Sequence, residues 1–296
     1  MDYLSMDINE KIGMATELAC LLEVSAEKPG NVTPTHDFAD TKYQDFLVSA
    51  VAIGKAFRNV SNASVGETIL QAVKDTRALT SVNTNLGIIL LLAPLAKAYT
   101  ISNNSFRDNL KRVIKGVTVD DARLTYEAIR IVAPGGMGKV KESDINGSEV
   151  KITLLDAMVL AKDRDSIARE YVTDFKITLE TGLPALKEVI LKQVPISDAI
   201  IQTFLILLSQ VPDTLIARKA GIDTAKDISD QAADVLMSGG IFSEKGRNKI
   251  KDLDTLLRRS EKIPHDNRLN PGTTADLTAA VLFVYLMENG LKVQAL

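Results

Sequence analysis

The sequence predicts an all-α protein. Apolar residues recur at spacings of three and four along most of the 296 residues, which is the period of an amphipathic helix. Segments that alternate apolar and polar residues between turn dipeptides are nearly absent. Proline, glycine, asparagine and serine divide the chain into roughly a dozen helical segments. We therefore expect a single compact multi-helix domain over residues 1–296.

The helical period is found, in chain order, at residues 14–24, 46–57, 67–79, 86–96, 227–237 and 278–287. The runs at 86–96 and 278–287 are apolar almost all round, so they predict core helices, and both are shorter than a membrane span. Residues 139–154 are the best hairpin candidate, with Asn146-Gly147 as the turn, and we interpret them as a polar loop that leads into a helix. Asp165 and Arg169 lie four residues apart on one helix face, as in a surface ion pair.

The composition excludes several classes of protein. The 35 Lys and Arg nearly balance the 38 Asp and Glu, so we expect no nucleic-acid partner. One cysteine and two histidines rule out an internal disulfide and make a zinc site of the usual type improbable. The N-terminus has no export signal, so we expect a cytoplasmic protein without a membrane partner. The oligomeric state is not predicted.

Four irregular stretches interrupt the helices, and function tends to lie on loops that a rigid scaffold holds. The first is EKPGNVTPTHDFADT at 27–41. Lys28 and the backbone amides around Gly30 could bind phosphate, because successive amides in a turn form an anion site. The alternative is a plain helix stop at Pro29 and Gly30. A divalent cation is a further possibility at three side chains of this loop: His36, Asp37 and Asp40.

The second stretch is TSVNTNLGIILLLAPL at 80–95, where polar residues lead directly into an apolar helix. The free amides and partial positive charge of a helix N-terminus favour an anion there. Asn83, Thr84 and Gly87 are the candidates for binding it. The alternative is that Asn83, Thr84 or Asn85 simply caps the helix.

The third stretch is SQVPDTLIARKAG at 209–221. Asp213 is a candidate Mg²⁺ ligand, and Arg218 and Lys219 can neutralise phosphate oxygens. The alternative is an N-cap aspartate followed by a solvated basic turn.

The fourth stretch is RLNPGTTADLTAAVLFVYLMENG at 268–290, in which Asp276 is the only acid near the start of an apolar helix. Thr273 and Asp276 have the spacing of a capping box, which is the structural explanation for the acid. The same helix start also carries Asn270 and the flexible Gly272, beside the carboxylate.

At these four stretches the sequence resembles the triphosphoribosyl-dephospho-CoA synthase family. KPGNV at 28–32 is similar to the family's Lys-Pro-Gly-Leu-Val, and VNTNLG at 82–87 to its Val-Asn-Thr-His-Lys-Gly. DTLIARKAG at 213–221 resembles Asp-Thr-Asn-Leu-x-x-Arg-Gly-Gly. NPGTTADLTA at 270–279 resembles Asn-Pro-Gly-Gly-Ser-Ala-Asp-Leu-Leu-Ala, which is the most specific of the four. The matches follow the family's order along nearly the whole chain.

The resemblance implies a helical transferase that uses ATP as a substrate together with Mg²⁺. The ribose 2′-hydroxyl of 3′-dephospho-CoA attacks C1′ of the ATP ribose, adenine leaves, and the triphosphate stays intact. Triphosphate binding then falls to Lys28, Gly30, Asn83, Thr84, Gly87, Arg218, Asn270 and Gly272. Asp213 and Asp276 are the candidate catalytic acids and metal ligands, with the division between base and ligand left open.

The chain departs from the family pattern at Asn85-Leu86, where the family has His-Lys, and at Lys219-Ala220, where it has Gly-Gly. Two alternatives therefore stay open. One is a related nucleotide-dependent glycosyl transferase with another acceptor, such as a pterin or ribosyl precursor. The other is a helical nucleotide-binding protein without catalysis.

Overall fold

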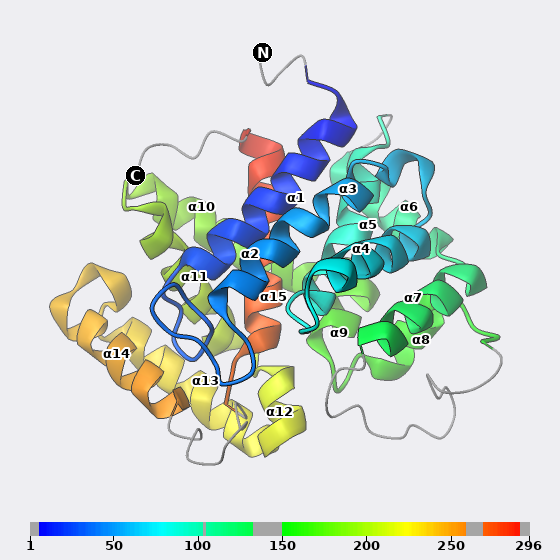
Figure 1. Ribbon diagram of the computed structural model, residues 1–296. Coiled ribbons are helices and arrows are strands. Elements are labelled where there is room, and N and C mark those ends of the chain that lie inside the picture. The colour runs from blue at the N-terminus through cyan, green and yellow to red at the C-terminus, as the bar shows by residue number, and fades with distance from the viewer. Residues whose placement is uncertain (1–5, 103–104, 133–149, 259–268, 291–296) are drawn as a thin grey trace.

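The computed structural model describes residues 6–102, 105–132, 150–258 and 269–290 (Figure 1). Over these ranges the chain is helical, and its only β-type pairing is an isolated antiparallel bridge between Thr33 and His36. The predicted all-α fold class is confirmed. Most of the hairpin candidate at 139–154 lies outside the described residues, and the helix expected after it begins at Leu154.

The helices follow one another along the chain with short connections. They are α1 (Ile8–Ser25), α2 (Tyr43–Ala52), α3 (Gly54–Phe57), η2 (Val60–Asn62), α4 (Val65–Leu79), α5 (Leu86–Tyr99), α6 (Phe106–Gly116), α7 (Val119–Val132), α8 (Leu154–Ala161), α9 (Ser166–Val172), the π-helical η3 (Ile177–Gly182), α10 (Leu183–Leu191), α11 (Ile196–Gln210), α12 (Thr214–Ala220), α13 (Ile222–Met237), η4 (Gly240–Phe242), α14 (Glu244–Arg258) and α15 (Gly272–Asn289).

Helix α15 lies at the centre of the fold, behind α1 in the view of Figure 1. It packs against α1, α5, α10 and α11, and the side chains from Leu277 to Val284 are all buried. Helix α5 is equally apolar, with an unbroken buried run from Ile88 to Ala96. The two runs predicted as core helices are therefore the core of the molecule, as expected for helices that are apolar all round.

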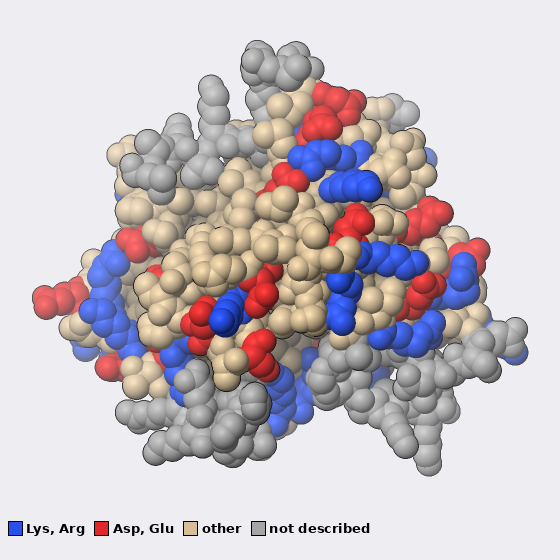
Figure 2. All heavy atoms as spheres, in the orientation of Figure 1, with Lys and Arg blue, Asp and Glu red and all other residues tan. Residues whose placement is uncertain are grey.

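No single helix in the described part of the chain is long and apolar enough to cross a membrane. Helices α11 and α12 meet the length and composition criteria only as a pair bent by 56°. The interior of α11 is part of the protein core, where Phe204, Leu205, Leu207 and Leu208 are fully buried. On the face shown in Figure 2, acidic and basic side chains are interspersed around an uncharged centre.

Candidate active site

A cavity of about 250 Å³ opens where the irregular stretches of the sequence meet. Its wall is formed by the end of α1, the 27–41 loop, α2, the start of α5, the end of α7, the start of α9, α12 and the start of α15. Apolar side chains such as Phe38, Phe46 and Ile129 line part of it. The charged and amide side chains that line it are Glu23, Asn31, Asn83, Asn85, Asp165, Arg218, Asn270 and Asp276.

Hydrogen bonds join the N-terminal ends of three helices beside this cavity. The Asp213 carboxylate, at the N-cap of α12, accepts bonds from the Thr274 amide at 2.7 Å and the Thr274 hydroxyl at 2.8 Å in α15. Thr214 Oγ1 accepts a bond from the Ser166 amide of α9 at 3.2 Å and donates one to Thr273 Oγ1 at 3.3 Å. The starts of α9, α12 and α15 are thus held as one unit.

Asp276 is a half-buried residue of the cavity wall, and it lies directly against the start of α5. A Cβ added to Gly87 would stand only 2.0 Å from Asp276 Oδ2, so the carboxyl group touches the α5 backbone where no side chain intervenes. Within the described ranges its carboxylate has no hydrogen bond or ion pair. Burial first, and then the nearby Glu23, Asp213 and Asp165, raise the pKa of Asp276 well above its usual value, while Arg218 opposes them.

The capping-box explanation for Asp276 was wrong. Helix α15 begins at Gly272 with Pro271 at the N-cap, which makes no side-chain capping bond, and the Thr274 amide is bound by Asp213 of α12 instead. Asp276 is therefore in the second turn, too far along the helix to satisfy its first amides. A half-buried acid that lines a cavity and has no hydrogen bond or ion pair within the described ranges is a candidate functional group.

Lys28 is fully buried behind the cavity wall and is not among the lining residues. Its ammonium pairs with Glu23 Oε1 at 3.0 Å and also donates to the backbone carbonyls of Glu23 and Ala26. Since an ammonium has three donors, these three acceptors use all of them. Direct phosphate binding by Lys28 stays a prediction that the observed contacts do not favour.

Glu23 lines the cavity, and the sequence analysis did not identify it. Its Oε1 pairs with the Lys28 ammonium at 3.0 Å, and no hydrogen bond to its Oε2 is found among the residues that the structure describes. Burial raises the pKa of Glu23, and the neighbouring Lys28 opposes that increase. The lysine of the KPGNV segment therefore supplies the counter-charge for a carboxylate that faces the cavity.

Asp213 makes the capping contacts that the structural alternative predicted. Its Oδ1 accepts the amides of Leu215 at 2.9 Å and Ile216 at 3.1 Å, and its Oδ2 accepts the two Thr274 donors. Four donors saturate a buried carboxylate. The catalytic and metal roles predicted for Asp213 stay untested. In the structure its carboxylate holds α12 against α15.

The residues before α5 reach the cavity as expected. Asn83, Thr84 and Gly87 all line it. Asn83 Oδ1 accepts the Leu86 amide at a long 3.4 Å, while the Thr84 hydroxyl bonds to Ser49. Asn85 has no side-chain capping bond, although it occupies the N-cap position. The first amides of α5 are thus only weakly capped, next to Asp276 and the cavity.

Arg218, Asn270 and Gly272 also line the cavity. Arg218 is exposed, and in the described part of the chain its guanidinium makes no hydrogen bond or ion pair. Asn270 Oδ1 is a buried oxygen without a hydrogen-bond partner. Buried polar atoms are normally paired, so the Asn270 oxygen is available to a bound ligand, as is the exposed Arg218 guanidinium.

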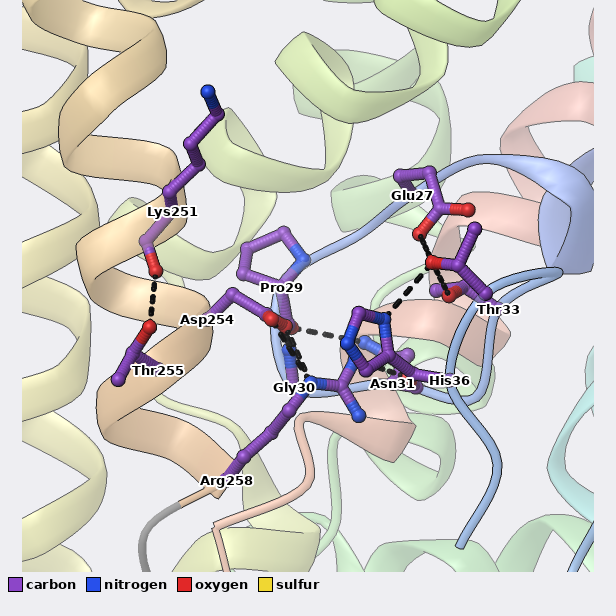
Figure 3. Close-up of polar contacts among 11 residues, drawn as sticks. Glu27, Pro29, Gly30, Asn31, Thr33, His36, Lys251, Asp254, Thr255 and Arg258 are labelled. Carbon is purple, nitrogen blue, oxygen red and sulfur yellow. Dashed lines mark hydrogen bonds and ion pairs between the residues drawn. The ribbon is translucent and has the colours of Figure 1, made fainter.

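Gly30 is not among the residues that line the cavity. Its amide donates to Asp254 Oδ1 of α14 at 2.8 Å (Figure 3). Its positive φ of 76° suits glycine. The histidine and acids of the same loop make local contacts: His36 with Thr35, Asp37 with the Tyr43 amide, and Asp40 with Thr41. Across the described ranges no group of three His, Cys, Asp or Glu residues is arranged to hold a metal ion.

Asp165 also lines the cavity, whereas the sequence analysis interpreted it as part of a surface ion pair. Its Oδ1 caps α9 by accepting the Ile167 amide at 2.8 Å, and its carboxyl group faces the cavity. Arg169 donates instead to the Lys162 carbonyl at 3.2 Å. The expected surface ion pair was therefore wrong, because the aspartate is a helix cap and the arginine turns back along the chain.

Comparison with known proteins places this chain in a family. The family model for ATP:dephospho-CoA triphosphoribosyl transferase matches residues 9–294. A protein from Malonomonas rubra named "Probable 2-(5''-triphosphoribosyl)-3'-dephosphocoenzyme-A synthase" is 24% identical, over 95% of this chain and 89% of that protein. A protein of the same name from Acinetobacter calcoaceticus is 23% identical, over 98% of this chain and 97% of its own length.

A solved structure is also similar. It is the crystal structure of a protein assigned as triphosphoribosyl-dephospho-CoA synthase from Archaeoglobus fulgidus. The match has a TM-score of 0.64 and 27% identity, and it covers 82% of this chain and 99% of the other.

Proposed function

Because the chain belongs to the ATP:dephospho-CoA triphosphoribosyl transferase family, we propose that it transfers the triphosphoribosyl group of ATP to a ribose hydroxyl of 3′-dephospho-CoA. The family is one of transferases, so the chain is a transferase; the donor, acceptor and site residues are our proposal. In the proposed step the acceptor oxygen bonds to C1′ of the ATP ribose and the C1′–N9 bond breaks. Adenine leaves with the electron pair of that bond and gains one proton, which balances the proton that the acceptor hydroxyl loses. The triphosphate remains on the transferred ribose.

The observation that carries this proposal is the unpartnered Asp276 carboxyl group at the weakly capped start of α5, inside the cavity. Departure of adenine builds positive charge on the ribose, and an ionised carboxylate beside C1′ stabilises that charge. In the free cavity burial disfavours ionisation of Asp276. Positive charge on the ribose in the transition state favours the ionised form of Asp276 instead. The attraction between the carboxylate and the ribose is therefore strongest in the transition state, where it lowers the barrier.

Glu23 is the best placed base for the acceptor hydroxyl. One of its oxygens is held by Lys28 at 3.0 Å, and the other has no donor in the described ranges. A base is most effective when its pKa lies near the working pH, and burial moves the Glu23 pKa in that direction. Glu23 would take the hydroxyl proton as the new C1′–O bond forms, with Lys28 keeping the carboxylate ionised beforehand.

The triphosphate would be bound by the exposed Arg218 guanidinium and the amides at the start of α5, near Asn83 and Thr84. Asn270 and Gly272 border the same space. Mg²⁺ usually takes one or two protein carboxylates and completes its shell with phosphate oxygens and water. Asp165, the other half-buried carboxylate of the wall, would supply one such ligand, and the bound ion would neutralise phosphate charge.

A different acceptor is the second candidate, and one observation favours it. Asn85, which stands where the family has histidine, directs its amide to the Ser49 carbonyl and the Thr76 hydroxyl, both at 3.4 Å. Its neighbour is Leu86, so the start of α5 lacks the family's cation. A hydroxyl acceptor with fewer anionic groups than dephospho-CoA would suit this wall.

The test is product analysis with ATP, Mg²⁺ and a panel of acceptors that includes 3′-dephospho-CoA. Free adenine together with a dephospho-CoA product heavier by one triphosphoribosyl group supports the proposal. Adenine release that needs another acceptor supports the second candidate. Formation of ADP, AMP or pyrophosphate in place of adenine would contradict both.

A further inference from the structure

Asp254 and Arg258 are a pair on α14 that bind the Lys28–Asn31 turn from outside the cavity (Figure 3). Arg258 Nε donates to both Asp254 oxygens, at 2.8 and 2.9 Å. Asp254 Oδ1 also accepts the Gly30 amide at 2.8 Å, and Arg258 Nη2 donates to the Asn31 carbonyl at 2.7 Å. Two side chains one helical turn apart thus hold backbone groups of two successive residues of the turn, the Gly30 amide and the Asn31 carbonyl.

The turn is also packed tightly against α14 and the start of α15. A Cβ on Gly30 would lie 2.7 Å from a methyl carbon of Leu257 and 3.0 Å from Pro271 Cδ. The side chains of the pair are largely shielded, with 12% of Arg258 and 24% of Asp254 exposed. Charge-assisted bonds in such a site are stronger and less screened than those of exposed pairs.

The Lys28–Asn31 turn is connected to the cavity at two points. Asn31 is a residue of the cavity wall, and its amide nitrogen bonds back to the Lys28 carbonyl at 3.3 Å. Lys28 is the only ion-pair partner of Glu23 in the described ranges. A displacement of the turn therefore moves Asn31 and the ammonium group that fixes Glu23.

We propose that Asp254 and Arg258 are positioning residues for the transfer reaction, acting through the Lys28–Asn31 turn on the Glu23 carboxylate. Neither residue lines the cavity. This role rests on the proposed function. It adds two residues of α14, which lie in none of the four sequence motifs. It predicts a loss in turnover with little change in nucleotide binding, because Arg218 and the start of α5 do not contact the pair.

The experiment compares Arg258→Ala with Arg247→Ala in steady-state assays of adenine release. Arg247 is a matched control because it lies about three helical turns before Arg258 on α14, is half exposed and pairs with Asp198 of α11 instead of the turn. We expect kcat of the Arg258 variant to fall about tenfold to hundredfold, as for a misplacement of about 1 Å, with KM for ATP changed less than about threefold. Arg247→Ala should match the unsubstituted protein.

Two further variants separate positioning from folding. Arg258→Lys can still pair with Asp254 but has no second nitrogen for the Asn31 carbonyl, so it should restore part of kcat. Asp254→Asn keeps an oxygen for the Gly30 amide and serves if Arg258→Ala does not fold. Unchanged kcat in the Arg258 and Asp254 variants, or a change in KM alone, would overturn the positioning role. If the unsubstituted protein and Arg247→Ala release no adenine with any acceptor, the proposed function fails first and this role falls with it.

Discussion

Replacing Gly87 by alanine tests the contact between Asp276 and the start of α5. The added Cβ would stand 2.0 Å from Asp276 Oδ2 and 2.5 Å from Cγ, whereas ordinary contacts begin at 3.4 Å. The carboxyl group must therefore move by more than about 1 Å, and displacements of that size at a catalytic group cost on the order of a hundredfold in rate. We expect kcat for adenine release to fall by about that factor.

Stability should not follow activity in this variant. Gly87 has an ordinary helical backbone, and alanine favours a helix over glycine by at most about 1 kcal/mol. The clash falls on the end of a movable side chain, so Tm should stay within a few degrees of the unsubstituted protein. Gly116→Ala is the matched control, because a Cβ there meets nothing within 4 Å. Full activity of Gly87→Ala at unchanged Tm would refute a role for the Asp276 position.

Four other substitutions give separate predictions. Asp276→Asn keeps nearly the same shape and should abolish adenine release while circular dichroism shows an intact fold; full activity would leave Asp276 without a catalytic role. Lys28→Met removes the charge that opposes the rise in the Glu23 pKa, so the acidic limb of the kcat/KM profile should move to higher pH, and an unmoved limb would exclude Glu23 as the base. Arg218→Ala should raise KM for ATP about tenfold or more, with partial recovery in Arg218→Lys, and equal KM values would remove Arg218 from the triphosphate site. Burial raises the pKa of Glu170 from 4.5 to about 7, so the folded state holds this proton more tightly than the unfolded state. The difference stabilises the folded protein by up to about 3 kcal/mol. This stabilisation is present below pH 4.5 and is lost as the pH rises through about 7. Denaturant unfolding at pH 5 and pH 8 should show this loss in the unsubstituted protein and not in Glu170→Gln.

The helices could be predicted from the sequence because their signal is local. Runs such as 86–96 and 278–287 are too apolar to face water on any side, and they form the buried helices α5 and α15. The loops that interrupt such helices were equally visible. That is why Asn83, Arg218, Asn270 and Asp276 could be found as candidates, and all four line the cavity.

The sequence offered helix capping as one role for Asp213, but its contacts with Thr274 could not be predicted, because they come from a distant part of the chain. Nor does the sequence show that the Lys28 side chain folds back on Glu23 and Ala26, which are close to it in the chain. Lys28 looks like a phosphate ligand until its three donors are found to be used by Glu23 and Ala26. Asp213 looks like a metal ligand until the Thr274 donors of a helix 61 residues away complete its shell.

Glu23 and Asp165 were missed for the opposite reason, since each sits in an ordinary helical pattern. Glu23 is the last acid of an amphipathic helix, and Asp165 has the spacing of a surface pair. Only the packing of α1 and α9 against the start of α15 brings their carboxyl groups to the cavity. The residues of α14 that hold the Lys28–Asn31 turn carry no motif at all.

The most direct test of the account is the fate of the C1′–N9 bond of ATP in a single turnover with 3′-dephospho-CoA and Mg²⁺. The account predicts one adenine released for each acceptor modified, and a product that retains all three phosphates on the new ribose. It also predicts that Asp276→Asn forms neither under the same conditions. Cleavage of a phosphoanhydride bond with the C1′–N9 bond intact would contradict it.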